Sequence, residues 1–180
     1  MRVSHTHRVL FHLITAGAMA GAASLGAAPL GAQEAEQTWA SSGPAWVLQA
    51  GQWYANVDGT VGALRAELPM GRSGRWLFVP GVTYAHYTLG SSPTQIDLFA
   101  PEALVQLQLG RGRFRPYVGG GAGVVLINMF HTFDPVLSLG AGLRADLTSQ
   151  WGARVELDTR AFGQFDAGSV GWSVGLARRF

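Results

Sequence analysis

The sequence predicts an all-β protein: an eight-stranded antiparallel up-and-down transmembrane β-barrel, preceded by a cleaved signal peptide. Three observations predict this fold class. The N-terminal segment is apolar and has the pattern of an export signal. The rest of the chain alternates apolar and polar residues with period two. Turn residues separate segments that reach the roughly 9–11 residues a tilted strand needs to cross a bilayer.

The composition fits neither a disordered chain nor a typical cytosolic enzyme. Of 180 residues, 25 are glycine and only 13% are charged. The absence of cysteine excludes a disulfide scaffold, a thiol nucleophile and a cysteine zinc site. All 13 basic residues are arginine, and without Arg2 and Arg8 the count of 11 equals the 11 Asp plus Glu. A near-neutral mature chain does not indicate a nucleic-acid partner.

Residues 1–32 have the features of a signal peptide. Arg2 and Arg8 give a positive start, an apolar run rich in Ala, Gly and Leu follows, and small residues lead to a cleavage site near Ala32. A permanent anchor helix is the alternative, but the run is Gly-rich and stops at Pro29. We therefore expect a signal peptide over 1–32, a short flexible lead over 33–43 and the barrel over 44–180.

Eight segments after Pro44 are predicted to form strands. In the segment 151–161, for example, Trp151, Val155 and Leu157 lie on one face, and Arg154 and Glu156 lie on the other. No window shows convincing helical periodicity. The predicted strands are 45–56, 60–68, 76–89, 97–109, 115–127, 136–147, 151–163 and 169–180.

The alternation by itself does not say which face is buried. A soluble sandwich places apolar faces inward, whereas a membrane barrel places them on lipid and encloses polar residues. Facing strands carry charges of both signs, and the apolar faces end in Trp151, Trp172 and Phe180. We therefore interpret the charged faces as the lumen. An eight-stranded barrel is just wide enough for side chains to fill it, and buried charges must pair. The predicted ion-pair network, which plugs the lumen, consists of Arg65, Glu67, Glu102, Arg144, Asp146, Arg154, Glu156, Asp158 and Arg160.

Several motifs carry a family resemblance. The stretch RPYVGGGAG at 115–123 and FVPGVTY at 78–84 resemble strands of the outer membrane protein β-barrel domain family, the OmpA-like and opacity-like barrels. So do LGAGLRADLT at 139–148 and WGARVE at 151–156. The final VGLARRF at 174–180 is similar to the C-terminal signal read by the barrel-assembly machinery, with Arg178 as a departure from its apolar pattern. The signal residues are Trp172, Val174, Gly175, Leu176 and Phe180.

The resemblance implies a bacterial outer-membrane location with both termini in the periplasm. It then predicts periplasmic turns at Pro69–Arg75, Gly110–Phe114 and Thr148–Gln150. The outer loops fall at Val57–Gly59, Gly90–Gln95, Asn128–Pro135 and Gln164–Gly168, and their shortness disfavours an adhesin. The expected partners are outer-membrane lipids (lipopolysaccharide and phospholipid) and, during biogenesis, the barrel-assembly machinery. We expect a monomer. Arginines of the periplasmic end are hypothesised to contact lipid phosphates, and outer-end aspartates to meet lipopolysaccharide through divalent cations.

The sequence contains few residues in patterns typical of catalysis. A rim triad of His86 or His131 with Asp134 and Ser91 is conceivable, but the histidines follow no known deacylase spacing. No metal-ligand spacing appears, and the glycines at 119–123 have no following Lys-Ser/Thr, so no phosphate loop or cofactor is expected. The sequence favours a non-enzymatic integral outer-membrane protein that contributes to envelope structure. The alternatives are a lipid A-modifying enzyme, a narrow pore for small solutes and a surface interaction protein.

Overall fold

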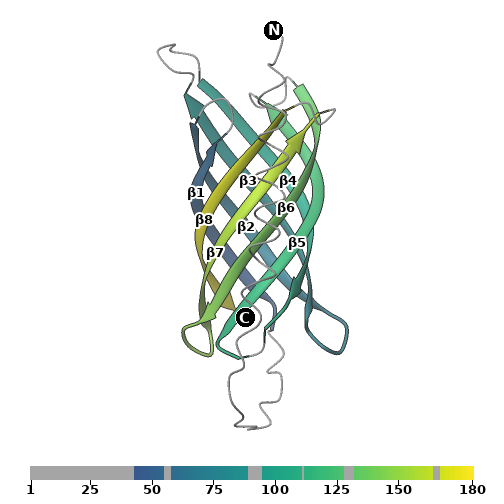
Figure 1. Ribbon diagram of the computed structural model, residues 1–180, viewed down its shortest axis with the longest axis vertical. Coiled ribbons are helices and arrows are strands. Elements are labelled where there is room, and N and C mark those ends of the chain that lie inside the picture. The colour runs from purple at the N-terminus through teal and green to yellow at the C-terminus, as the bar shows by residue number, and fades with distance from the viewer. Residues whose placement is uncertain (1–42, 55–57, 89–94, 111, 128–131, 164–166) are drawn as a thin grey trace. The chain divides into compact units, whose positions relative to one another are not determined.

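A computed structural model describes residues 43–54, 58–88, 95–110, 112–127, 132–163 and 167–180 (Figure 1). The predicted signal peptide over 1–32 and residues 33–42 of the predicted lead lie outside these ranges. None of the described residues belongs to a helix long and apolar enough to cross a membrane.

The described residues form eight strands, as the alternation predicts. Most predicted connections lose residues to the strands: strands begin at Asp58, Gln95, Phe114 and Ala167, all placed in connections from the sequence. Two further extensions include prolines. Pro69, placed in a turn, belongs to the second strand and pairs with Leu77, and Pro135, placed in a loop, belongs to the sixth and pairs with Val124. Both prolines keep a carbonyl that can accept a hydrogen bond, so a missing N–H does not by itself end the strand. The strands are β1 (Ala45–Tyr54), β2 (Asp58–Met70), β3 (Trp76–Thr88), β4 (Gln95–Gln108), β5 (Phe114–Ile127), β6 (Thr132–Asp146), β7 (Trp151–Phe162) and β8 (Ala167–Arg179).

The sheet closes on itself. Each strand pairs antiparallel with the next along the chain, and β1 also pairs with β8, from Ala45 opposite Arg179 to Tyr54 opposite Val170. Figure 1 shows the strands tilted around one closed barrel. Closure leaves no sheet edge with unpaired backbone groups, which is the condition for a β-structure to exist in lipid. The predicted eight-stranded antiparallel up-and-down barrel is confirmed.

The barrel has two ends, which we call the turn end and the loop end. At the turn end β1 begins and β8 ends, and β2 is followed there by β3, β4 by β5 and β6 by β7. Gly71, Gly74 and Gly112 have φ values of 69°, 60° and 99° there, a conformation that only glycine adopts readily. At the loop end β1, β3, β5 and β7 end and β2, β4, β6 and β8 begin. Both ends carry exposed aromatic residues on the outer face, as an interfacial girdle does: Trp46, Trp76, Phe114, Trp151 and Phe180 at the turn end, and Tyr54, Tyr84, Phe99, Phe133 and Trp172 at the loop end.

Between the two girdles the outer face is apolar. Leu157 is 56% exposed, Val174 49% and Leu143 42%, and each lies on the outward face of its strand. The neighbouring residues on the same strands, such as Glu156 and Arg144, are almost fully buried. Large aliphatic side chains stand outside and ionised groups stand inside, which is the reverse of a soluble β-protein. The outer face is therefore built for hydrocarbon.

Candidate functional site

All nine residues of the predicted network lie on the inward faces of β2, β4, β6 and β7. Eight of them are buried, and Asp146 at the turn end is partly exposed. The period-two pattern directs them there, since residues i and i+2 of a strand share a face. The structure joins them through ion pairs, some within one strand and others between strands that are far apart in the sequence.

Glu102 on β4 accepts hydrogen bonds from across the lumen. Arg160 on β7 holds both of its carboxylate oxygens, with Nη1–Oε2 at 2.6 Å and Nη2–Oε1 at 3.1 Å. Thr83 donates at 2.7 Å, Ser138 donates at 3.1 Å, and Arg65 lies at 3.5 Å. A buried carboxylate is stable only when its lone pairs are satisfied, and here donors from four other strands satisfy them.

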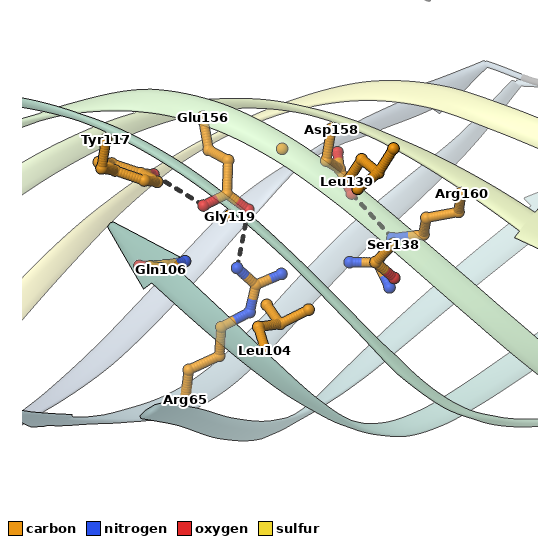
Figure 2. A pocket seen from close by; sticks show the side chains of 11 residues that line it. Arg65, Leu104, Gln106, Tyr117, Gly119, Ser138, Leu139, Glu156, Asp158 and Arg160 are labelled. Atoms are coloured by element: carbon orange, nitrogen blue, oxygen red, sulfur yellow. Dashed lines mark hydrogen bonds and ion pairs between the residues drawn. The ribbon is translucent and has the colours of Figure 1, made fainter. Parts of the chain in front are cut away.

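Glu156 on β7 is the second centre of the network. It accepts a hydrogen bond from Arg65 Nη1 at 2.7 Å and from the Tyr117 hydroxyl at 2.7 Å, and it pairs with Arg154. Figure 2 shows Arg65 and Tyr117 reaching Glu156 from two different sides, with Asp158 and Arg160 farther along the lumen. The Arg154 guanidinium also lies 4.6 Å from the centre of the Tyr117 ring. The tyrosine thus fixes both members of this ion pair.

The network continues to the turn end. Glu67 pairs with Arg144 and with Arg154, the latter at 2.9 Å. Arg144 also lies 3.5 Å from Asp146. Asp146 then pairs with Arg115, and with Arg179 at 2.6 Å.

The ion pairs therefore form one chain of alternating sign along the lumen. Every charge in it has a partner of opposite sign on each side until the two ends. Such a chain offsets the desolvation of each group through two neighbours instead of one. Followed from one ion pair to the next toward the turn end, its members are Asp158, Arg160, Glu102, Arg65, Glu156, Arg154, Glu67, Arg144, Asp146, and finally Arg115 and Arg179 together.

Sequence reasoning missed several members of this site. Arg115, Tyr117 and the hydroxyls of Thr83 and Ser138 belong to it, and the alternation on their strands places them inward. Arg115 was available from that pattern, because it lies two residues before the inward Tyr117. The neutral donors carry no charge pattern, so only the register reveals them.

The lumen has little free space around the network. One cavity of about 10 Å³ lies between Arg65, Tyr117 and Glu156 (Figure 2), and another of about 10 Å³ lies beside Trp53 and Arg160. A cavity of this size holds about one water molecule at most. Glycine makes the filling feasible: a Cβ on Gly142 would overlap the Tyr117 hydroxyl. Side chains thus fill the middle of the barrel.

An apolar cluster lies inside the barrel on the loop-end side of the network, and we call it the apolar cap. It was not predicted, since apolar residues were assigned to the lipid face. Gly171 leaves room for the indole of Trp53, because a Cβ there would overlap that ring. The cap consists of Trp53, Val61, Ala85 and Tyr87, with Ile96, Leu98 and Phe162 packed against them.

Outside the barrel, near the loop end, the structure joins His86 to Asp97. Nδ1 of His86 lies 2.8 Å from Oδ1 of Asp97, and the Tyr84 hydroxyl donates to the same oxygen at 2.6 Å. The pairing of His86 with Asp134, one form of the rim triad considered from the sequence, does not occur. His86 faces outward on β3, whereas Asp134 shares the inward face of β6 with the buried Val136 and Ser138.

The other members of that triad, Ser91 and His131, lie outside the described residues. Among the described residues no group of three or more His, Asp or Glu could hold a metal ion.

The residues of the predicted assembly signal lie on and after β8. Trp172, Val174 and Leu176 face outward and are 40%, 49% and 54% exposed, while Gly175 faces the lumen. Phe180 follows the strand, donates its backbone N–H to the Pro44 carbonyl at 3.1 Å, and stacks on Trp46 with 5.8 Å between ring centres. The chain end is thus tied to the beginning of β1.

Comparison with solved structures identifies the same fold in outer-membrane proteins. Neisserial surface protein A is 12% identical, and the match covers 76% of this chain and 96% of that one with a TM-score of 0.60. The N-terminal β-barrel domain of Pseudomonas aeruginosa OprF is 17% identical, covering 76% and 97%, with a TM-score of 0.50. The outer membrane enzyme PagL is 13% identical, covering 76% and 99%, with a TM-score of 0.52. Neither a protein-family model nor a curated protein sequence matches the chain.

Proposed function

We propose that this chain, which has the fold of the eight-stranded outer-membrane β-barrels, is a non-enzymatic structural protein of the outer membrane with a plugged lumen. The observation that carries the proposal is the alternating ion-pair chain that runs from Asp158 to Asp146, closed on the loop-end side by the apolar cap. An open pore needs a continuous column of water through the lumen. Here the charged side chains occupy the lumen and pair with one another instead of with water. Its partners are then the surrounding lipid, and the barrel-assembly machinery during biogenesis.

Planar-bilayer recording tests the plug. The wild-type protein should give no stable conductance steps. A variant with Arg65→Ser, Glu102→Ser, Asp158→Ser and Arg160→Ser removes the part of the chain next to the apolar cap. It removes two positive and two negative charges, and the next carboxylate, Glu156, keeps its pair with Arg154. This variant should give small steps, which would show that the assay detects an opened lumen. Stable steps from the wild-type protein would contradict the proposal and favour the narrow-pore alternative.

Deletion of the gene tests the structural role. Loss of the protein should increase the sensitivity of the cells to detergent, and His86→Ala should restore resistance as fully as the wild-type protein does. The His86 side chain is outside the plug, so a structural protein does not need it. Failure of His86→Ala to restore resistance, at equal protein abundance, would argue against a purely structural protein.

A second candidate is hydrolysis of a membrane lipid ester near the loop end, and the His86–Asp97 pair is the observation that favours it. A carboxylate that accepts from Nδ1 fixes the tautomer in which Nε2 is free to act as a base. Thr60, the Cα partner of His86 on β2, adds an outward-facing hydroxyl in the same row. Purified protein should be incubated with lipid A and with phospholipid, and the lipids analysed by mass spectrometry. Loss of one acyl chain that is abolished by His86→Ala would support this candidate over the first.

A further inference from the structure

A groove lies on the lipid-facing side of the barrel across β6, β7, β8 and β1. Its volume is about 510 Å³, within the roughly 300–1,000 Å³ of small-molecule sites. Its wall is almost wholly apolar. The outward-facing residues that line it are Leu48, Ala50, Leu143, Ala145, Ala153, Val155, Val174 and Leu176.

The register explains why the surface is hollow at this place. Ala145 and Ala153 are Cα partners on neighbouring strands, so two methyl side chains stand side by side. Leu143 and Leu176 rise beside them, 42% and 54% exposed. A pair of small residues between large ones leaves a depression, and a flexible hydrocarbon chain can fill it with close contacts.

Arg178 stands at the turn-end side of this groove. It is two residues beyond Leu176 on the same face of β8, and its Cα partners are Trp151 on β7 and Trp46 on β1. Its guanidinium lies 5.6 Å from the centre of the Trp151 ring. The position is the level of the aromatic girdle, where lipid headgroups begin.

No carboxylate among the described residues pairs with Arg178. Its neighbour Arg179 points inward and pairs with Asp146 at 2.6 Å. Arg178 is thus a cation on an otherwise apolar face, and it interrupts the C-terminal pattern at this one position. A planar guanidinium suits a phosphate, which accepts two of its parallel hydrogen bonds.

We propose that the groove binds a membrane phosphoglyceride from the leaflet at the turn end. One acyl chain lies over Ala145 and Ala153, and the phosphate accepts hydrogen bonds from Arg178, which the Trp151 ring supports from below. Because the acyl chain and the phosphate belong to one lipid molecule, the groove and Arg178 bind it together. The site depends on the membrane location of the barrel and is independent of whether the lumen conducts.

Native mass spectrometry of the full protein released from detergent micelles tests the site. The probe is a phosphatidylglycerol, with a diacylglycerol of the same chains as the phosphate-free comparison. Wild type should retain one phosphatidylglycerol and no diacylglycerol. Arg178→Gln should weaken retention about tenfold, the loss expected for a charge-assisted hydrogen bond. Ala153→Leu, which fills the groove and leaves Arg178 intact, should weaken it similarly.

Arg113→Gln is the matched control. Arg113 also lies at the turn end, 5.9 Å from the ring of Phe114, but it precedes β5 and does not line the groove. Its loss should leave retention unchanged, and a heat-dependent gel shift should show that every variant is folded. Unchanged retention in either Arg178→Gln or Ala153→Leu would overturn the proposal. A dimer that Ala153→Leu dissociates would also overturn it, because the groove would then hold a second copy.

Discussion

The guanidinium of Arg160 lies 4.2 Å from the centre of the Trp53 ring, inside the barrel. This contact joins the ion-pair chain to the apolar cap, because Arg160 also holds Glu102 and Asp158. A fully buried arginine keeps its charge at little cost only where every side of the group has a favourable contact. Here carboxylates accept hydrogen bonds from Nε, Nη1 and Nη2, and the Trp53 indole lies over one face of the guanidinium.

Replacing Trp53 should therefore affect both parts of the lumen. Trp53→Ala should lower the free energy of unfolding by about 3–5 kcal/mol, as expected for removal of a large buried aromatic side chain. Trp53→Phe keeps an aromatic face toward Arg160 and should lose clearly less. Urea unfolding in detergent micelles measures both values. Equal losses for the two variants would show that the ring face contributes nothing to holding Arg160.

Gly142 tests the close packing beside Tyr117. Gly142→Ala places a methyl group too close to the Val155 backbone carbonyl oxygen and to the Tyr117 hydroxyl. The strand and the tyrosine must shift to accommodate it, at a cost of about 1–3 kcal/mol. Gly62→Ala is the matched control, since the nearest atom to its new Cβ is the Gln49 carbonyl oxygen at 3.9 Å. We expect that variant to stay within about 0.5 kcal/mol of the wild type. The same unfolding experiment compares them, and equal losses would argue against a close contact at Gly142.

Leu157 tests which side of the wall faces lipid. It lies near the middle of β7, between the enclosed Glu156 and Asp158, and it is 56% exposed. Leu157→Arg should destabilise the protein in lipid vesicles by about 2–4 kcal/mol, the cost of a cation at the bilayer midplane. Leu157→Ala should cost much less. If the arginine variant were as stable as the alanine variant in vesicles, the outer face of β7 would not be in hydrocarbon.

Phe180 tests the end of the chain. Phe180→Ala removes the stacking on Trp46 and the terminal aromatic residue of the sequence similar to the assembly signal. The abundance of the Phe180→Ala variant in the membrane fraction of cells should fall. Refolding of the purified variant into detergent should change little, because the Phe180 side chain is 68% exposed. Phe133→Ala, at the loop end and 63% exposed, should affect neither measurement. A refolding defect as large as the cellular one would indicate a structural role instead.

Part of the site could be read from the residues and part could not. Alternation places Arg154, Glu156 and Asp158 on one face of one strand, because a strand repeats every two residues. The pairing of Glu102 with Arg160 was not accessible, since it joins β4 to β7 across the lumen and depends on strand tilt and register. The same dependence on register explains why the His86–Asp97 pair near the loop end was not predicted. His86 meets Asp97 because β3 and β4 place their Cα atoms opposite each other, whereas the spacing along the chain suggested loop residues.

By itself the sequence determined the number of strands, their faces and the enclosure of charge, because these follow from a local period and from the cost of an unpaired ion in hydrocarbon. Only the tertiary structure decided which arginine holds which carboxylate. It alone revealed that Trp53 and Tyr87 cap the lumen from inside, since an apolar residue carries no mark of the side it faces when both environments accept it. Closure of the sheet makes that choice, because it fixes what lies opposite each side chain across the barrel.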